Sequence, residues 1–283
     1  SSCSGNCGLY HPGKTAQLTK TGGRLRRRNP SRHRKVVIVD RKHLFFLFAG
    51  EVIDRASPAK GKAFTILSKE LAHRIYTVLR LQPGEKLQLF SSTLILTVSV
   101  LASPRPKDTF CAEVEAVEKI SPRINKITAA IGLLKKESFE EAVHHASVTG
   151  ASEIIPLVTT KSRKTWLHEN ERNRLESIIV AACEQAKNPH IPYLRNPQKL
   201  DACLREHEDW NKIAFEAGSS NSLHTLRQNP EKKSILFFGP EGGFTEEEET
   251  QLGLVNTLFY RLTPTILRTQ EAVCVALGFF NCS

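Results

Sequence analysis

One segment near the carboxyl end constrains the fold of this chain more than any other. The apolar residues 235–238 lead directly into the sequence Gly-Pro-Glu-Gly-Gly at residues 239–243. An apolar run of this length that ends in glycine is typical of a buried strand breaking into a turn, where a ligand can approach main-chain amides. Thr245 and Glu248 have the spacing of a capping box, which predicts a helix directly after the turn. The alternative is that the glycines serve only a tight strand-to-helix connection.

The helix after this turn restricts the kind of ligand. Residues 246–249 are four consecutive glutamates in its expected first turn, where they suit the helix dipole and repel a polyphosphate. The sequence also contains neither a P-loop nor a dinucleotide-binding fingerprint. We therefore expect a ligand with little or no negative charge.

Strands and helices alternate from residue 127 onward, which predicts an α/β domain. The expected strands are residues 127–134, 153–158, 213–216, 235–238 and 258–262, and the expected helices are residues 138–148 and 169–187. Such alternation implies a mainly parallel sheet with helices on both faces and a ligand at the carboxyl ends of the strands. Residues 216–218, 239–243 and 262–267 occupy three of these ends, so we expect them to converge. The expected buried face of the longer helix consists of Leu175, Ile178, Ile179, Ala182 and Ala186.

The preceding part of the chain has the pattern of a small β-barrel with a helix. Short strands are expected at residues 44–48, 86–90, 93–101 and 111–117, with a helical stretch at residues 68–79 between the first two. A chain of 283 residues with 40% apolar content has room for two domains. We therefore divide the chain into an extension at residues 1–41, a β-barrel at residues 42–123 and an α/β domain at residues 124–283.

The net charge of +11 suggests a nucleic-acid partner, but most of the excess charge lies in the extension. Residues 1–40 hold nine Lys and Arg residues against one acid and show no apolar periodicity, so we expect the extension to be disordered. Three interpretations are open: a contact to RNA phosphates, a targeting segment, or a solvated or artificial extension.

Neither a metal site nor a membrane span is expected. The seven cysteines are scattered without a C-x-x-C pair, and the longest apolar runs have only the length of strands. We recognise no signal peptide at the start of the sequence, and the odd number of thiols agrees with a reducing compartment. We therefore expect a soluble protein of the cytoplasm.

The turn at residues 239–244, followed by Ile-Leu-Arg-Thr-Gln-Glu-Ala at residues 266–272, closely resembles the RsmE family of SPOUT-class methyltransferases. The resemblance covers the chain from about His43 onward, with further matching segments at residues 133–136, 153–157, 182–186 and 216–218. Members of this family methylate N3 of a uridine in 16S ribosomal RNA, the RNA of the small subunit. The resemblance implies S-adenosylmethionine as the cofactor, and the cationic sulfonium of that molecule meets the charge condition above.

The resemblance also implies features that sequence patterns do not predict. SPOUT enzymes tie the α/β domain into a deep trefoil knot, bind bent S-adenosylmethionine in its loops and form homodimers whose active site draws on both subunits. The amino-terminal barrel resembles the family's PUA-like RNA-binding domain. The assembled small subunit is the expected RNA partner, because RNA shape carries recognition that single contacts cannot.

For the cofactor site, the residue pattern and the resemblance agree. Glycines permit close backbone approach, and the main chain after the last strand is expected to hold adenine. Glu216 is a candidate acceptor from a ribose hydroxyl, with a solvated carboxylate as the alternative. Gly242→Val is expected to abolish cofactor binding. The candidate cofactor-binding residues are Glu216, Gly218, Gly239, Glu241, Gly242, Gly243, Leu262, Thr263, Ile266 and Leu267.

Methylation of uridine N3 requires loss of the N3 proton and alignment of N3 with the carbon–sulfur bond. The candidate catalytic residues are Arg268, which would stabilise negative charge on the uracil carbonyls, and Glu271, a possible proton acceptor. The alternative is that these two residues, three apart at a helix start, simply pair with each other. The general base stays unassigned.

Six residues in the part of the chain that the resemblance covers are candidates for RNA contact: His73, Arg80, Lys161, Glu184, Gln185 and Lys187. For His73 and Arg80, solvation on a helix surface is the alternative. Lys161 and Lys187 stand where arginine is more usual in the family, and lysine keeps the charge but loses bidentate geometry.

Two other functions are kept as alternatives. A methyltransferase of the same superfamily would act on another RNA, such as tRNA, or on a 2′-hydroxyl. A noncatalytic RNA-binding or ribosome-assembly factor would keep the cofactor fold without turnover.

Overall fold

The computed structural model describes residues 44–50, 52–55, 58–103, 105, 107–123, 126–162, 167–226 and 233–282. The prediction of a disordered extension at residues 1–41 lies outside the described residues. Residues 42–283 form one compact unit, which contains two β-sheets. Within the described ranges, no helix is long and apolar enough to cross a lipid bilayer.

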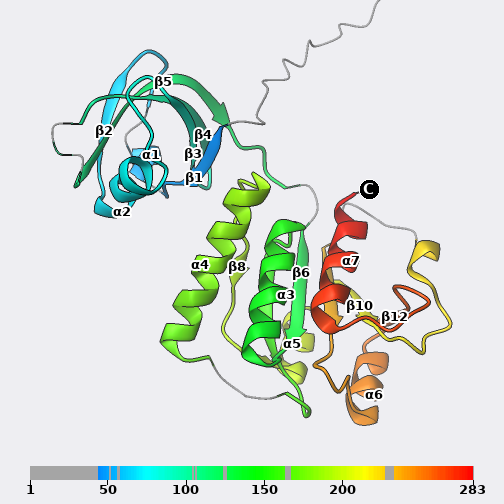
Figure 1. The fold of residues 1–283 in the computed structure, drawn as a ribbon. Helices are drawn as coiled ribbons and strands as arrows, with labels where there is room; N and C mark the ends of the chain where they lie inside the picture. Colours follow the sequence, from blue (N-terminus) through cyan, green and yellow to red (C-terminus); the bar gives the residue numbers. More distant parts are fainter. Residues whose placement is uncertain are drawn as a thin grey trace, which may run out of the picture. The chain divides into compact units, whose positions relative to one another are not determined.

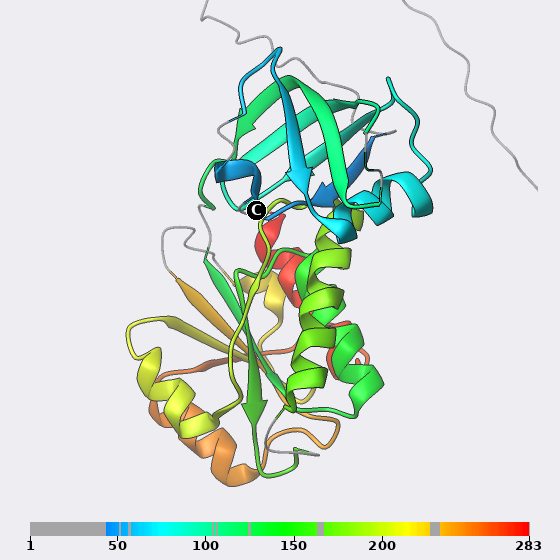
Figure 2. The ribbon, with the colours of Figure 1, turned by 90° about the vertical axis from the view of Figure 1, so that its left-hand side faces the viewer.

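The amino-terminal sheet has five strands in the order β1-β3-β4-β5-β2. The strands are β1 (Phe45–Phe48), β2 (Ala63–Leu67), β3 (Lys86–Phe90), β4 (Leu94–Val100) and β5 (Thr109–Lys119). β1 and β3 are parallel, whereas β3, β4, β5 and β2 pair in antiparallel fashion. The sheet is curled, as Figure 1 and Figure 2 show. Its core includes the buried Leu87, Leu96 and Phe110.

The helical stretch predicted at residues 68–79 is present in two parts. Ser68 caps α2 (Lys69–His73) by accepting a hydrogen bond from the amide of Leu71 at 3.2 Å. The chain continues as a π-helical turn, η2 (Arg74–Val78), which is too short a deviation for a sequence pattern to reveal.

Two elements of this part were missed by the sequence analysis: β2 and the short helix α1 (Val52–Arg55). β2 buries Ile66 but leaves Leu67 78% exposed. Because an apolar residue faces solvent, the sequence of β2 does not show the alternation by which strands are recognised.

The second sheet confirms the predicted mainly parallel arrangement. Its strands are β6 (Ile127–Gly132), β7 (Glu153–Val158), β8 (Tyr193–Leu194), β9 (Gln198–Lys199), β10 (Asn211–Phe215), β11 (Ser234–Phe238) and β12 (Leu258–Tyr260). They follow the order β12-β10-β11-β6-β7-β8, with β9 also paired to β7, and the pairs are parallel. Every residue of β6 and β11 is buried, which explains why these two strands appear in the sequence as continuous apolar runs.

Helices cover both faces of this sheet, as predicted (Figure 1 and Figure 2). The helices are α3 (Lys136–Val148), α4 (Glu169–Ala186), α5 (Leu200–Glu206), α6 (Glu246–Leu254) and α7 (Thr269–Asn281). On one face, α3, α4 and α7 contribute Phe139, Leu175 and Val273 to a common core. On the other, α5 and α6 contribute Leu204 and Leu252 to a second core.

The buried face of α4 differs from the prediction at its end. Leu175, Ile179 and Ala182 are buried and Ile178 is partly buried, but Ala186 is exposed. The reason is that the helix stops there, because Lys187 adopts a left-handed conformation with φ of 51°. The short elements β8, β9 and α5 were not predicted, since two-residue strands carry no periodicity.

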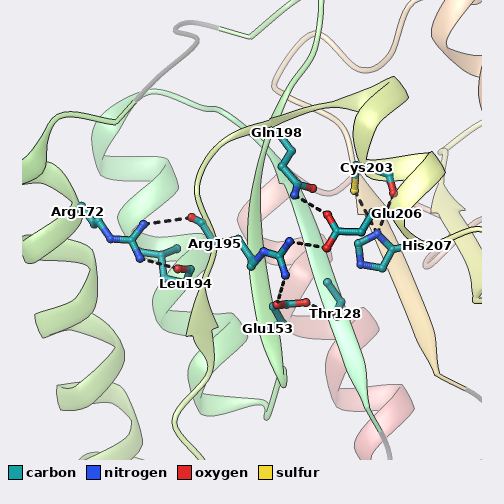
Figure 3. Close-up of polar contacts among 9 residues, drawn as sticks. All are labelled: Thr128, Glu153, Arg172, Leu194, Arg195, Gln198, Cys203, Glu206 and His207. Carbon is teal, nitrogen blue, oxygen red and sulfur yellow. Dashed lines mark hydrogen bonds and ion pairs between the residues drawn. The ribbon is translucent and has the colours of Figure 1, made fainter.

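A polar network fixes the chain between β8 and α5 (Figure 3). The Arg195 guanidinium donates to Glu153 of β7 at 3.1 Å and also to Glu206 of α5, which accepts a further bond from Gln198 at 2.8 Å. The hydrogen bonds from Gln198 and Arg195 lower the pKa of Glu206. Arg172 of α4 donates to the carbonyl of Leu194 at 2.7 Å. This segment is thus tied to elements on both faces of the sheet.

Arg195→Met is expected to lower the free energy of unfolding by about 2 kcal/mol, because the partly buried Glu153 and the more exposed Glu206 lose their shared cation. Urea denaturation measures the change. The matched control is Arg205→Met, which removes an exposed pair with Asp201 along α5 and is expected to cost less than about 0.5 kcal/mol. Equal losses in the two variants would show that the network adds nothing beyond a surface ion pair.

Candidate functional site

A cavity of about 560 Å³ opens at the carboxyl ends of β10 and β11. Its walls come from five places: the ends of these two strands with the turns that follow them, Lys135 and Ser138 at the start of α3, Glu249 of α6, and residues 266–270 with Ala272 at the start of α7. Glu271 does not line the cavity. The structure therefore brings together the loops that the parallel topology predicts to converge.

The candidate cofactor residues divide into two groups. Those that line the cavity are Glu216, Gly239, Glu241, Gly243, Ile266 and Leu267. Gly218, Gly242, Leu262 and Thr263 belong to the same loops but do not line the cavity. Leu262 packs against the core under α3, α4 and α7, and the Thr263 hydroxyl donates to the carbonyl of Thr265 at 2.6 Å.

The glycine turn at residues 239–243 is tightly packed at one end and open at the other. A Cβ atom on Gly239 would lie 3.2 Å from the backbone of Gly243, which itself has φ of +68° and open space around its Cα. A Cβ on Gly242 would lie 3.0 Å from Cδ of Lys161, the middle of a flexible side chain.

The tightest contact of the site involves Gly132, at the end of β6, which the sequence analysis did not single out. A Cβ atom there would lie 2.6 Å from the backbone nitrogen of Pro240. The only sequence signal is a glycine inside an otherwise apolar strand pattern, which marks a close approach of another backbone.

Polar contacts hold the glycine turn from two sides. The Thr269 hydroxyl at the start of α7 donates to the carbonyl of Gly239 at 2.9 Å. The Glu241 carboxylate accepts from the amide of Lys135 at 3.2 Å, directly before α3. Because Lys135 offers no side-chain cap of its own, Glu241 serves the amino terminus of α3 from another segment.

Arg268 and Glu271 contact each other through the main-chain amide of Arg268 and the side-chain carboxylate of Glu271. Glu271 accepts from the Arg268 amide at 2.8 Å and so closes the first turn of α7. Within the described residues, no carboxylate pairs with the Arg268 guanidinium, and Arg268 lines the cavity. The structure therefore shows no side-chain ion pair between these two described residues, which was the alternative interpretation.

The cavity carries more acidic than basic side chains. Glu216, Glu241 and Glu249 line it together with Lys135 and Arg268. Burial raises the pKa of Glu249, and the neighbouring charge of Glu216 adds to the rise. Such a lining suits a neutral or cationic ligand better than a polyphosphate. Among the described residues, no group of three or more His, Cys, Asp or Glu side chains is arranged to hold a metal ion.

The model of an RNA methyltransferase domain matches residues 121–281, more than half of the chain. The chain belongs to this RNA methyltransferase family. The matched range contains the whole parallel sheet, its helices and the cavity at the carboxyl ends of its strands.

Similar proteins with known names indicate which branch of the family the chain resembles. The chain is 27% identical over 219 residues to the ribosomal RNA small subunit methyltransferase E of Buchnera aphidicola subsp. Schizaphis graminum, covering 75% of this chain and 87% of the relative. It is 26% identical over 233 residues to the ribosomal RNA small subunit methyltransferase E of Bacillus subtilis, covering 77% of this chain and 90% of the relative. The resemblance to the RsmE family is thereby confirmed.

Solved structures share the fold. A Legionella pneumophila protein, solved in complex with the bound cofactor SAM, is 26% identical with a TM-score of 0.70 and covers 84% of this chain and 97% of its own. The ribosomal RNA small subunit methyltransferase E from Neisseria gonorrhoeae bound to S-adenosyl methionine has a TM-score of 0.74 at 20% identity and covers 85% and 98%. The matched part of this chain is longer than the α/β domain alone, so the structural likeness extends into the amino-terminal sheet.

The candidate RNA residues of this family member lie in different parts of the structure. His73 and Arg80 are exposed near the end of α2 and after η2, and Arg80 has a left-handed φ of 56°. Gln185 is exposed on α4. Lys187 ends α4, and its ammonium is buried without a hydrogen-bond partner among the described residues.

Glu184 takes part in a contact that the sequence analysis missed. Its carboxylate accepts two bonds from the Arg74 guanidinium and a third, at 2.8 Å, from the amide of Phe48. Arg74 follows the candidate His73 directly, but nothing in the sequence marks its partner 110 residues away.

Gly132→Ala is expected to lower the free energy of unfolding by about 3 kcal/mol, because the added methyl group overlaps the Pro240 backbone and must displace the glycine turn. The matched control is Gly253→Ala in α6, where a Cβ meets nothing within 4 Å. That variant is expected to be more stable by about 0.5 kcal/mol, since alanine favours the helical conformation more than glycine does and Gly253 lies in the last turn of α6. A neutral Gly132→Ala variant in urea denaturation would contradict the close approach.

Proposed function

We propose that this protein is an S-adenosylmethionine-dependent methyltransferase that methylates N3 of a uridine in 16S ribosomal RNA. The observation that carries the proposal is the cavity built from the glycine turn and the segment before α7. Membership of the RNA methyltransferase family, the names of the relatives and the cofactor bound in two structures of the same fold support it.

The cavity fits the chemistry of S-adenosylmethionine. Gly239 and Gly243 present main chain without side chains, as adenine recognition through backbone groups requires. Leu267 and Ile266 offer apolar surface beside them, and Ile266 is 85% exposed, so this surface is available. Glu216 and Glu249 add negative charge, which suits ribose hydroxyls and the cationic part of the cofactor.

Two residues at the start of α7 are proposed to act on the uridine. The cofactor supplies the methyl group, and the protein must hold N3 in line with it and manage the N3 proton. The Arg268 guanidinium, unpaired among the described residues, would stabilise negative charge on the uracil carbonyls. Glu271 uses one carboxylate oxygen, Oε2, to cap α7 and place Arg268, which leaves Oε1 as the candidate proton acceptor.

The remaining family features are proposals with partial support. We propose a trefoil knot because the family resemblance implies one, and the chain segments concerned lie together: Gly132 at the end of β6 approaches Pro240, and Thr269 at the start of α7 donates to the Gly239 carbonyl. A homodimer agrees with the apolar α7, whose Val275 is 41% exposed. The curled amino-terminal sheet would be the PUA-like domain, with His73 and Arg80 among its RNA contacts, and the enzyme would work in the cytoplasm on the assembled small subunit.

The deciding test is transfer of labelled methyl groups from S-adenosylmethionine to small ribosomal subunits that lack uridine-N3 methylation, followed by mass mapping of the modified nucleoside. The expected product is 3-methyluridine. Methylation of a ribose or of tRNA would assign another reaction of the superfamily. Cofactor binding without transfer to any RNA would favour a noncatalytic assembly factor.

Arg268→Ala is expected to lower kcat for this reaction about 100-fold while the fold and the cofactor affinity change little, because the guanidinium acts on the uracil. Single-turnover methylation at saturating cofactor measures the effect. The matched control is Arg205→Ala, which removes an exposed arginine of α5 outside the cavity. Normal turnover in Arg268→Ala would remove this residue from the mechanism.

A further inference from the structure

A compact turn follows β7 and faces the glycine turn. Within it, the amide of Thr159 donates to the Ser162 hydroxyl at 3.0 Å, and the amide of Ser162 donates to the carbonyl of Thr159 at 3.1 Å. The Ser162 hydroxyl also contacts the carbonyl of Leu157, the residue before the last of β7. These bonds fix the turn, which we call the 159–162 turn, on a buried strand.

Lys161 extends from the 159–162 turn to the glycine turn. Its ammonium donates to the carbonyl of Gly242 at 2.8 Å and to the carbonyl of Phe244 at 2.9 Å. The two carbonyls flank Gly243, the residue of this segment with a left-handed φ of +68°. Hydrogen bonds from a charged donor are stronger than neutral ones, so Lys161 holds the segment on both sides of its most unusual residue.

Glu248 makes the reciprocal connection from the first turn of α6. One carboxylate oxygen accepts from the amide of Thr160 at 2.7 Å, and the other accepts from the amide of Thr245 at 2.9 Å. Glu248 is only 7% exposed, so the contact is held in a buried setting. The 159–162 turn and the glycine turn are thus joined in both directions.

The surroundings of Lys161 disfavour an RNA phosphate. Two of its three donors already point at carbonyl oxygens. Four glutamates form the adjacent first turn of α6. The pKa of Glu247 is lowered mainly by hydrogen bonds from its own amide and from Thr245, with a further contribution from the charge of Lys161. A phosphate at this ammonium would meet these carboxylates.

We propose that Lys161 is a positioning residue for the cofactor, which sets the geometry of the glycine turn, and that it is not a contact to RNA. The inference rests on the proposed use of S-adenosylmethionine in the cavity. Lys161 does not line that cavity, so it acts through the Gly242 and Phe244 carbonyls. It replaces the expectation, drawn from the sequence, that this lysine binds RNA.

The test compares Lys161→Ala, Lys161→Arg and the control Lys136→Ala in the full-length protein. Lys136 is an exposed lysine at the start of α3, and it is not among the described residues that line the cavity. Calorimetry gives the affinity for S-adenosylmethionine, and filter binding of small ribosomal subunits gives the affinity for RNA. Urea denaturation shows whether each variant is folded.

Lys161→Ala is expected to weaken cofactor affinity about tenfold, as loss of charged hydrogen bonds predicts, with unchanged affinity for the subunit. In turnover, the cofactor KM rises and kcat at saturation is kept. Lys161→Arg is expected to restore the affinity, since a guanidinium can donate to both carbonyls, and Lys136→Ala should match the wild type.

Wild-type cofactor affinity in Lys161→Ala overturns the inference, and weaker subunit binding in the same variant would return Lys161 to the RNA contacts. If the wild-type protein binds no S-adenosylmethionine, both the proposed function and this inference are wrong. Cofactor binding that depends on Lys161 without any methyl transfer supports the inference and counts against the proposed reaction alone.

Discussion

The close approach of β6 to the glycine turn is the constraint on which the site depends. Only a residue without a side chain at Gly132 lets the backbone nitrogen of Pro240 come as near as it does. This approach places the turn over the end of a fully buried strand, so Glu241 reaches α3 and Thr269 reaches the Gly239 carbonyl. The positions of the cavity, of the amino termini of α3 and α7 and of the glycine turn therefore all depend on this close approach.

The helix termini around this point explain the charge preference of the cavity. α3, α6 and α7 each begin with an amide that donates to a glutamate: Glu241, Glu248 and Glu271 respectively. A helix amino terminus is otherwise a ready site for an anion. Because a glutamate of the protein already occupies all three helix termini, the site is poorly suited to bind a phosphate. The four glutamates after Thr245 already indicated this in the sequence.

How far the sequence predicts the structure depends on whether the relevant interaction is local. The strand at residues 153–158 and the capping box of Thr245 and Glu248 were predicted correctly, because apolar runs and caps are local signals. α5 and β8 were missed because tertiary contacts such as those of Arg195 hold them. The convergence of the loops followed from parallel topology, but the constraint at Gly132 did not.

Residue roles were the hardest to infer, for the same reason. Lys161 and Glu184 were chosen for their charge, yet a charge in a sequence does not reveal its partner. In the structure, Lys161 contacts carbonyls more than 80 residues away, and Glu184 contacts Arg74 110 residues away. Arg268 could be placed at the cavity because the segment around it begins a helix, which a local pattern does show.

The order of the strands has a consequence for folding kinetics. β11 lies between β10 and β6, so the centre of the sheet can form only after the chain has closed a loop of about one hundred residues, and loop closure of this kind slows folding. The start of α7 then adds the last wall of the cavity. The pocket is thus incomplete until α7 has packed on the sheet, and ligand capture during refolding would report the docking of this helix.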